Sequence, residues 1–331
     1  MAQIKIGVIG TGGMAQGHIK RLMEHEDAAV AALCDIKPQA LERTIANHPG
    51  LEDVPRFADF GEMLRNTDLD AVQIITPHTV HYDQIIESLG AGLHVLTEKP
   101  MVCKVSHAHH VVKAVQESGK VLVLSYQRHY QPEFLYIRNA IKSGEYGPVQ
   151  FVQGLQCQGW YRGCRGSWRQ EMEWGGGGQL NDSGSHLLAV LLFVTGLSVN
   201  QVGAFIDNFD VPVDINSALS IQFDGGAQGN ISVVGNAPSW HEDITIWCDR
   251  GVFYMRQGTL EVCRPDGSRF KPTAAELPKG DCPDDNFVDA ILGRAEVGSP
   301  AIWGLRVIEL TEAAWKSAAS GKIEQVEHVK A

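Results

Sequence analysis

The segment at residues 4–15 reads Ile4-Lys5-Ile6-Gly7-Val8-Ile9-Gly10-Thr11-Gly12-Gly13-Met14-Ala15. A short apolar run is followed by the spacing G-x-G-x-x-A, which is typical of a strand, a tight turn and the start of a helix. The first glycine permits the turn, the second lets backbone approach a pyrophosphate, and the alanine lets the helix pack closely on the sheet. Free amides at the start of the helix favour an anion. We therefore expect a dinucleotide to contact Gly10, Gly12, Gly13, Met14 and Ala15.

An acidic residue lies where such a turn needs one, twenty residues beyond Ala15. Asp35 ends the second expected strand, Val30 to Cys34, and its carboxylate can accept both ribose hydroxyls of NAD while repelling a 2′-phosphate. The pattern therefore predicts NAD as the cofactor. NADP stays an alternative, because Lys37 is close enough in sequence to offset the charge of Asp35.

Apolar runs and helical periodicity alternate through the first part of the chain. Parallel strands joined by helices form a doubly wound sheet, so an α/β fold of the Rossmann type is predicted. The expected strands are Ile4 to Ile9, Val30 to Cys34, Ala71 to Ile75, Leu93 to Leu96 and Val121 to Leu124. The expected helices are Met14 to His25, Pro38 to Ala46 and Val80 to Ala91, with another between the last two strands.

The pattern changes after Ser125, where we place the boundary between a dinucleotide-binding domain, residues 1–125, and a substrate-binding domain, residues 126–331. Turns rich in glycine separate strand-like runs, which indicates an antiparallel sheet. The expected strands are Val149 to Cys157, Val199 to Phe205, Ala218 to Phe223, Gln228 to Val234, Asp243 to Cys248 and Val252 to Arg256. The expected helices are Pro132 to Lys142, Ser185 to Thr195 and Ile302 to Ala319.

Composition excludes several classes of protein. The formal charge is −11 with no run of Lys or Arg, so a nucleic-acid partner is not expected. The longest apolar run, Leu187 to Val194, is too short to cross a membrane. Seven dispersed cysteines and a start without signal-peptide character predict a cytoplasmic protein with reduced thiols. No cysteine pair has zinc-site spacing, and no metal is expected.

Further motifs occur in a characteristic order along nearly the whole chain, and with them the sequence resembles the Gfo/Idh/MocA family of oxidoreductases. These motifs are Thr76-Pro77-His78-Thr79-Val80-His81, Glu98-Lys99-Pro100, the run from Gly176 to His186, and Gly304-Leu305-Arg306-Val307-Ile308-Glu309.

The resemblance implies a Rossmann domain followed by an α/β domain with an open-faced, largely antiparallel sheet that pairs between subunits in a homodimer or homotetramer. It places Lys99, Asp182 and His186 around the reacting carbon, and it implies a cis peptide bond between Lys99 and Pro100. Cofactor contacts are also expected from Thr76, Pro77, His81, Glu98 and Lys99.

Oxidation of an alcohol needs a base for the hydroxyl proton and a group that stabilises charge on the oxygen. His186 is the candidate base, because the start of its helix favours the neutral ring. Asp182, four residues earlier, is expected to steady that ring, and Lys99 to contact the substrate oxygen or relay the proton. Each residue also has an ordinary explanation: Asp182 as a helix cap, His186 as a packed histidine and Lys99 as a surface lysine.

Other residues are candidates for the substrate cleft. Arg128 follows the last Rossmann strand, and His81 follows a strand end where ligands bind, although a solvent-facing histidine is equally consistent with its position. Trp160 and Trp168 belong to a segment rich in Trp and Arg, side chains that stack on sugars and pair with anions. That segment fits a specificity loop or a subunit interface.

The sequence thus predicts an NAD-dependent oxidoreductase that transfers a hydride between the nicotinamide and a hydroxyl-bearing carbon of a sugar, sugar derivative or cyclitol. One alternative is a glycoside hydrolase that oxidises its substrate transiently and releases no net NADH. Another is a nucleotide-binding redox sensor without catalytic activity.

Overall fold

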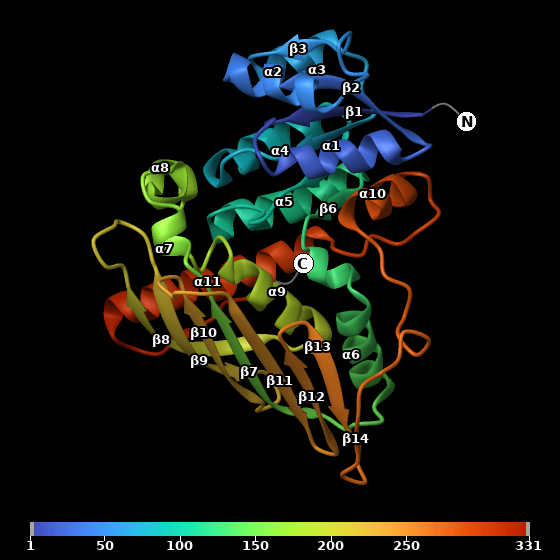
Figure 1. The fold of residues 1–331 in the computed structure, drawn as a ribbon. Coiled ribbons are helices and arrows are strands. Elements are labelled where there is room, and N and C mark those ends of the chain that lie inside the picture. Colours follow the sequence, from blue (N-terminus) through green and yellow to red (C-terminus); the bar gives the residue numbers. More distant parts are fainter. Residues whose placement is uncertain (1–2, 329–331) are drawn as a thin grey trace.

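The computed structural model describes residues 3–328, and its first part is built on a six-stranded parallel sheet (Figure 1). The strand order is β3-β2-β1-β4-β5-β6, which is that of a dinucleotide-binding Rossmann fold. The strands are β1 (Ile4–Ile9), β2 (Ala28–Cys34), β3 (Arg56–Phe57), β4 (Ala71–Ile74), β5 (His94–Thr97) and β6 (Leu122–Leu124). The predicted doubly wound sheet is therefore confirmed, with β3 as a short edge strand that the sequence did not indicate.

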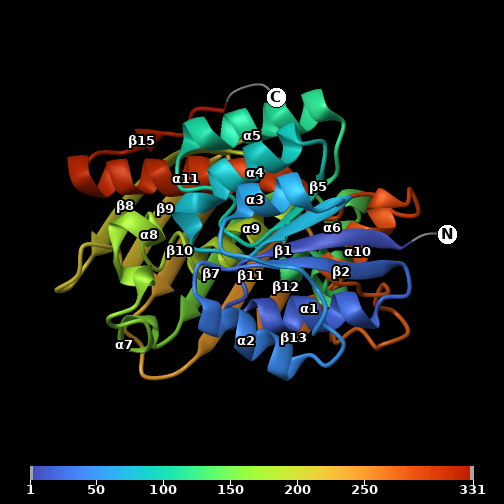
Figure 2. The same ribbon diagram turned by 90° about the horizontal axis from the view of Figure 1, so that it is seen from above.

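Helices cover both faces of this sheet, as the connections between parallel strands require. Figure 2 shows α1 and α2 on one side and α3, α4 and α5 on the other. Their bounds are α1 (Ala15–Glu24), α2 (Pro38–Asn47), α3 (Phe60–Asn66), α4 (His81–Gly90) and α5 (Val105–Ser118). A single 3₁₀ turn, His78–Val80, precedes α4.

The second sheet has nine strands in the order β14-β13-β12-β11-β7-β10-β9-β8-β15. It is mostly antiparallel, as predicted, but β7 and β10 pair in parallel because the long connection between them crosses the sheet. The strands are β7 (Val149–Cys157), β8 (Val199–Asp207), β9 (Asn216–Phe223), β10 (Gln228–Val234), β11 (His241–Cys248), β12 (Gly251–Arg256), β13 (Thr259–Cys263), β14 (Arg269–Phe270) and β15 (Glu324–Gln325).

Three helices cover one face of the second sheet (Figure 1): α6 (Pro132–Ser143), α9 (Gly184–Thr195) and α11 (Ala301–Ser320). Helix α9 packs on β7 and against α6 and α11, and every residue from Leu187 to Val194 is buried. A helix that is apolar on all sides needs such complete cover. The run that is too short to span a membrane is thus the centre of the core, and among residues 3–328 no helix has the length and apolar character to cross one.

One late segment returns to the first sheet. Helix α10 (Pro283–Ile291) packs against α1 and against β5 and β6, although most of residues 126–331 builds the second sheet. The sequence did not indicate this helix, because its contacts are with residues hundreds of positions earlier. Short helical turns also occur in the connection after β7: α7 (Trp160–Gly163), the 3₁₀ turn Trp168–Gln170 and α8 (Met172–Gly175).

The glycine run before Asp182 is required by close packing. A Cβ added to Gly178 would lie 1.9 Å from the carbonyl oxygen of Asp214. The Asp214 carboxylate also accepts hydrogen bonds from the backbone N–H groups of Gly178 and Leu180, at 3.0 and 2.6 Å. The run therefore allows two backbones to touch.

We predict that Gly178→Ala lowers the free energy of unfolding by about 3 kcal/mol, because the added methyl group would force the Asp214 backbone to move. Denaturant unfolding followed by tryptophan fluorescence measures this loss. Gly163→Ala is the matched control, since a Cβ at Gly163 would meet no described atom within 4 Å. Equal stability of the two variants would contradict the packing argument.

Candidate active site

A cavity of about 810 Å³ opens at the carboxyl ends of the parallel strands. This is where ligands bind in open α/β sheets. One wall is formed by the glycine turn and the ends of β2, β4 and β5, and includes Gly10, Asp35 and Thr76. The opposite wall comes from the connection after β7, including Trp168 and Trp174. The cavity therefore brings both parts of the chain to one ligand site.

The glycine turn has the space that a pyrophosphate requires. Gly10 has φ +86°, and a Cβ there would lie 2.5 Å from the Ile75 carbonyl oxygen. Gly12 and Gly13 line the cavity, and a Cβ at either would meet no described atom within 4 Å. Helix α1 has no side-chain cap and no acidic residue in its first turn, so its amides stay available to an anion.

Asp35 lies in the same cavity with a fixed orientation. One carboxylate oxygen accepts from the backbone N–H and hydroxyl of Thr11, at 2.8 and 3.2 Å, and the other accepts from the Lys37 backbone N–H at 2.9 Å. The remaining lone pairs can accept ribose hydroxyls. Arg43, which no sequence motif indicated, lines the cavity, as does Lys37. The glycine turn and Asp35 together fit a dinucleotide.

Lys99 reaches the cavity from the end of β5 and is paired with Asp182. Its Nζ donates to Asp182 Oδ1 at 2.5 Å and to the Asp182 carbonyl oxygen at 3.3 Å. The peptide bond between Lys99 and Pro100 is cis, as the resemblance implied. Lys99 itself lines the cavity, so this ammonium group can contact a bound ligand.

The Asp182 carboxylate is only 5% exposed and has two further donors. Trp160 Nε1 and Arg169 Nε donate to its second oxygen at 2.8 and 3.1 Å. Burial alone would favour the neutral acid, but the positive charge of Lys99 and, more weakly, that of Arg169 holds the pKa of Asp182 well below its usual range. Asp182 is therefore a permanent anion that orients a lysine.

This arrangement corrects the role predicted for Asp182. The carboxylate makes its hydrogen bonds with Lys99, Trp160 and Arg169 rather than steadying the ring of His186. It is not a helix cap either, since the residue in the cap position of α9 is Ser183. The distant donors could not be read from a spacing of four residues.

His186 lies half-buried in the first turn of α9, with its ring edge-on to Tyr126 at 6.0 Å. Burial, and then the positive charges of Lys99 and Arg128, hold the pKa of His186 well below its ordinary value. The ring is therefore neutral near pH 7 and able to accept a proton. It lies behind the cavity wall rather than among the lining side chains.

Of the two histidines that follow β4, His78 lines the cavity and His81 does not, which is the reverse of what the sequence suggested. His81 is fully buried, and its ring nitrogens face the carbonyl oxygens of Pro100 and Thr76 at 2.8 and 3.0 Å. It touches neither the cavity nor solvent, so both explanations offered for it were wrong. His78, for which no role was predicted, lines the cavity and lies 3.6 Å from Asp182 Oδ1. Burial lowers the pKa of His78 to about 3, so this ring is neutral.

Of the other predicted substrate contacts, Trp168 lines the cavity, whereas Trp160 and Arg128 do not. Trp168 lines the cavity, with its ring edge-on to His78 at 4.8 Å. Trp160 is 5% exposed and packs on Val213 and Ile215, so its face is not available for stacking on a sugar. Arg128 forms an ion pair with Glu242 at 2.6 Å and is not a lining residue.

The segment from Trp168 to Trp174 contributes other cavity residues that sequence reasoning missed. These are Arg169, Glu171 and Trp174. The guanidinium of Arg169 lies 4.4 Å from the Trp168 ring centroid, and its Nε is bound to Asp182. The only signal in the sequence was the high density of Trp and Arg in this segment.

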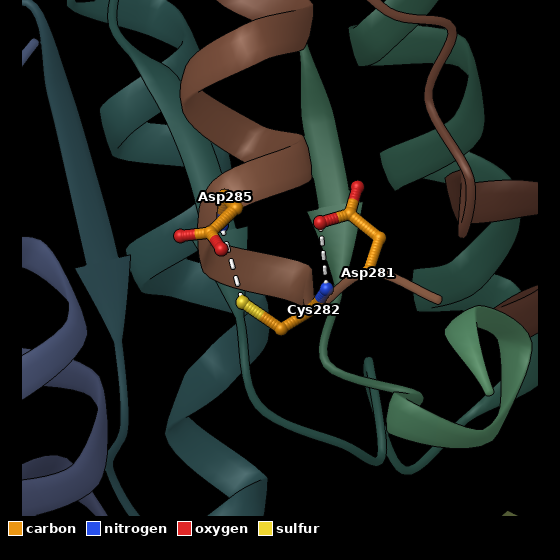
Figure 3. A group of neighbouring side chains, drawn as sticks. All are labelled: Asp281, Cys282 and Asp285. Carbon is orange, nitrogen blue, oxygen red and sulfur yellow. Dashed lines mark hydrogen bonds between the residues drawn. The ribbon is translucent and has the colours of Figure 1, made fainter. Parts of the chain in front are cut away.

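One group of possible metal ligands occurs among the described residues, at the start of α10: Asp281, Cys282 and Asp285 (Figure 3). Cys282 Sγ accepts from the Asp285 backbone N–H at 3.4 Å, and Asp281 accepts from the Cys282 backbone N–H at 2.8 Å. Burial raises the pKa of the Cys282 thiol to about 12, so the sulfur is protonated. These contacts describe a helix cap.

Comparison with known proteins agrees with this geometry. Residues 4–126 match the oxidoreductase family with an NAD-binding Rossmann fold, and residues 134–254 match the GFO/IDH/MocA C-terminal domain. Inositol 2-dehydrogenase of Arthrobacter sp. (strain FB24) is 26% identical over 91% of this chain and 89% of its own length. A 1-carboxy-3-chloro-3,4-dihydroxycyclohexa-1,5-diene dehydrogenase of Comamonas testosteroni is 26% identical over 74% of this chain, and the match spans only 61% of that protein.

Among solved structures, a levoglucosan dehydrogenase in complex with NADH and L-sorbose superimposes with a TM-score of 0.89. The two sequences are 20% identical, and the superposition covers 99% of this chain and 100% of the levoglucosan dehydrogenase chain. At this identity the similarity shows a shared fold. The two matched families account for the parallel sheet with its glycine turn and for most of the second sheet. The chain therefore belongs to the Gfo/Idh/MocA family of oxidoreductases, and its first part is the NAD-binding Rossmann fold of that family.

Proposed function

We propose that this protein is an NAD-dependent dehydrogenase or reductase that acts on a CH–OH group of a sugar, sugar derivative or cyclitol. The observation that carries the proposal is the position of Lys99: its ammonium group lines the dinucleotide cavity while Asp182 holds it from behind. Trp168 and Arg169 line the same cavity as Lys99 and the glycine turn.

When bound, the cofactor supplies a nicotinamide that exchanges a hydride with the substrate carbon. Gly10, Gly12, Gly13, Met14 and Asp35 would hold the dinucleotide, and Thr76, Pro77 and Glu98 complete the same wall. Ala15, which was also expected to contact the cofactor, is fully buried and does not line the cavity. Preorganised charge at the reacting oxygen is usually the largest contribution to such a step.

Lys99 Nζ donates a hydrogen bond to the substrate oxygen and so stabilises negative charge on it during oxidation. Asp182 directs this ammonium group at one point. His186, neutral because burial and neighbouring cations lower its pKa, lies behind the cavity wall and takes up a proton from Lys99 as Lys99 receives the hydroxyl proton. In reduction the same groups return the proton to the oxygen.

The wall opposite the glycine turn suits a hydroxylated ring. Trp168 and Trp174 offer faces for C–H groups, while Arg169 and Glu171 offer a donor and acceptors for hydroxyls. The names of two similar proteins, an inositol 2-dehydrogenase and a levoglucosan dehydrogenase, point to the same substrate classes.

The transient-oxidation hydrolase and the silent sensor make different predictions in one assay. The protein is incubated with NAD and a panel of sugars, inositols and aryl glycosides, while NADH absorbance and aglycone release are recorded. Net NADH supports the dehydrogenase, and aglycone without net NADH supports the hydrolase. If neither NADH turnover nor aglycone release is detected, in either direction of the reaction, the nucleotide-binding sensor is the interpretation that stands.

We predict that Lys99→Met lowers kcat at least about 1,000-fold, because the substrate oxygen loses its charged donor. Binding of NAD should change by less than about threefold, since the glycine turn and Asp35 are untouched. Steady-state kinetics and fluorescence titration measure the two quantities. Lys104→Met, an exposed lysine five residues away, should behave as wild type. Turnover that survives Lys99→Met would exclude this lysine from the chemistry.

The uncovered face of the second sheet supports a homodimer or homotetramer. Helices α6, α9 and α11 cover one face, while Phe205 is 86% exposed and Trp247 42% exposed. Strand register places Phe151 and Trp247 side by side on that uncovered face. Exposed aromatic side chains on an open sheet are typical of an interface.

We predict that light scattering after size exclusion gives the mass of a dimer or tetramer, and that Phe205→Asp shifts the equilibrium toward monomer at least about tenfold, because a charge would be buried in the interface. Met23→Asp, on α1 of the Rossmann part, is the matched control for an added surface charge. A wild-type protein that is monomeric at micromolar concentration would contradict the assembly.

The expectation of a cytoplasmic location rests on the thiols. All seven cysteines are free in the structure. Burial raises the pKa of Cys34 and Cys103 to about 12, so these thiols are unreactive and are retained as small apolar core residues.

A further inference from the structure

A network of buried charges lies directly behind Glu98, the neighbour of Lys99. His18 on α1 is 1% exposed, and its Nδ1 lies 2.7 Å from Asp284 Oδ1 while its Nε2 lies 3.1 Å from Glu98 Oε1. Asp284 is itself 1% exposed and comes from α10. The network therefore joins three segments that are far apart in sequence.

The geometry fixes the charge of the histidine. Both ring nitrogens face carboxylate oxygens, which only accept hydrogen bonds when ionised, so both nitrogens must donate and the ring is an imidazolium. Asp284 also accepts from Arg21 Nε at 2.5 Å and from Gln73 Nε2 at 2.9 Å, and three donors around one carboxylate, one of them a guanidinium, favour its ionised form.

The surrounding groups support this assignment. Burial alone would lower the pKa of His18, but hydrogen bonds to Asp284 and Glu98 raise it to about 9. Burial would likewise raise the pKa of Glu98, yet His18, with smaller contributions from Lys99 and the Ser125 hydroxyl, lowers it to about 2. The charged groups that face this cluster are thus Arg21, Asp284, Glu98 and Lys99.

Glu98 also lines the cofactor cavity, where it precedes Lys99. Its second oxygen accepts from the Lys99 backbone N–H at 3.2 Å. Glu98 is bound to the His18 imidazolium on the side away from the cavity, so the pair presents its negative end, the Glu98 carboxylate, to the cavity. NAD⁺ and NADH differ there by one positive charge on the nicotinamide ring, so a fixed negative charge favours the oxidised form.

We propose that His18 is a positioning residue for the cofactor site: clamped by Asp284 of α10, it keeps Glu98 ionised and directed at the cavity, and Glu98 in turn favours binding of NAD⁺ over NADH. The inference rests on the proposed function, because that function places the nicotinamide beside Lys99. It assigns His18 and Asp284 a role through Glu98, without contact to the cofactor.

The test is the ratio of the dissociation constants for NADH and NAD⁺, measured by fluorescence titration from pH 6 to pH 8.5. In the wild type most of His18 stays charged over this range, because its pKa is about 9, so the ratio should change by less than about twofold. In His18→Gln the pKa of Glu98 rises, because a buried carboxyl group loses its cation, and the carboxylate takes up a proton at the acidic end. The preference for NAD⁺ should then fall about fivefold between pH 8.5 and pH 6.

Glu98→Gln should show the lower preference at every pH, and adding His18→Gln to it should change nothing further. A merely structural defect would weaken both cofactors alike and leave their ratio flat. Arg294→Ala is the matched control. Arg294 follows α10 and forms surface ion pairs with Asp27 and Asp289, and the ratio in this variant should match that of the wild type.

A ratio in His18→Gln that follows the wild type at pH 6 would overturn the inference. If that variant does not fold, Glu98→Gln decides alone, since a wild-type ratio there would remove the basis of the proposal. A protein that binds neither cofactor would overturn the proposed function as well. Loss of turnover in Lys99→Met with a flat ratio in His18→Gln would leave that function intact and reject only the role of His18.

Discussion

The carboxylate of Asp182 is the constraint on which the site depends. A buried anion is tolerated only if donors surround it, and here the donors come from three directions: the end of β5, the turn at Trp160 and the loop at Arg169. Satisfying one charge therefore fixes the Rossmann sheet relative to the connection that closes the cavity. The close backbone packing at Gly178 serves the same end, since it places the turn that carries Asp182.

Two consecutive residues divide the work at the end of β5. Glu98 faces back into the first part of the molecule, where His18 neutralises it, while Lys99 faces the second part, where Asp182 does so. Opposite charges are thus presented side by side to one cavity, each with its own buried partner. Neither charge depends on a surface ion pair, and both are protected from screening by salt.

Much of the fold could be predicted because its signals are local. The glycine turn, the spacing to Asp35 and the alternation of strands and helices depend on neighbours within one supersecondary unit. Lys99, Asp182 and His186 could be named from their motifs, but their mutual contacts could not, because spacing along a helix does not reveal a lysine that approaches from another segment. The wrong assignments of His81 and Trp160 have a related cause. Both residue types are common in ligand sites, yet both side chains are buried in the protein interior. His78, Arg169 and α10 escaped notice since only the assembled chain gives them partners.

The return of α10 to the first sheet has a consequence for anyone who dissects the molecule. Excising the nucleotide-binding half at the point where the sequence pattern changes would strip α1 of the helix that covers it and leave His18 facing water on one side. A fragment that ends there lacks part of its own interior. A nucleotide-binding unit that folds by itself would have to combine two separate stretches of the polypeptide, the first part of the chain and the segment that carries α10. Joining distant segments in this way is also what a circular permutant does.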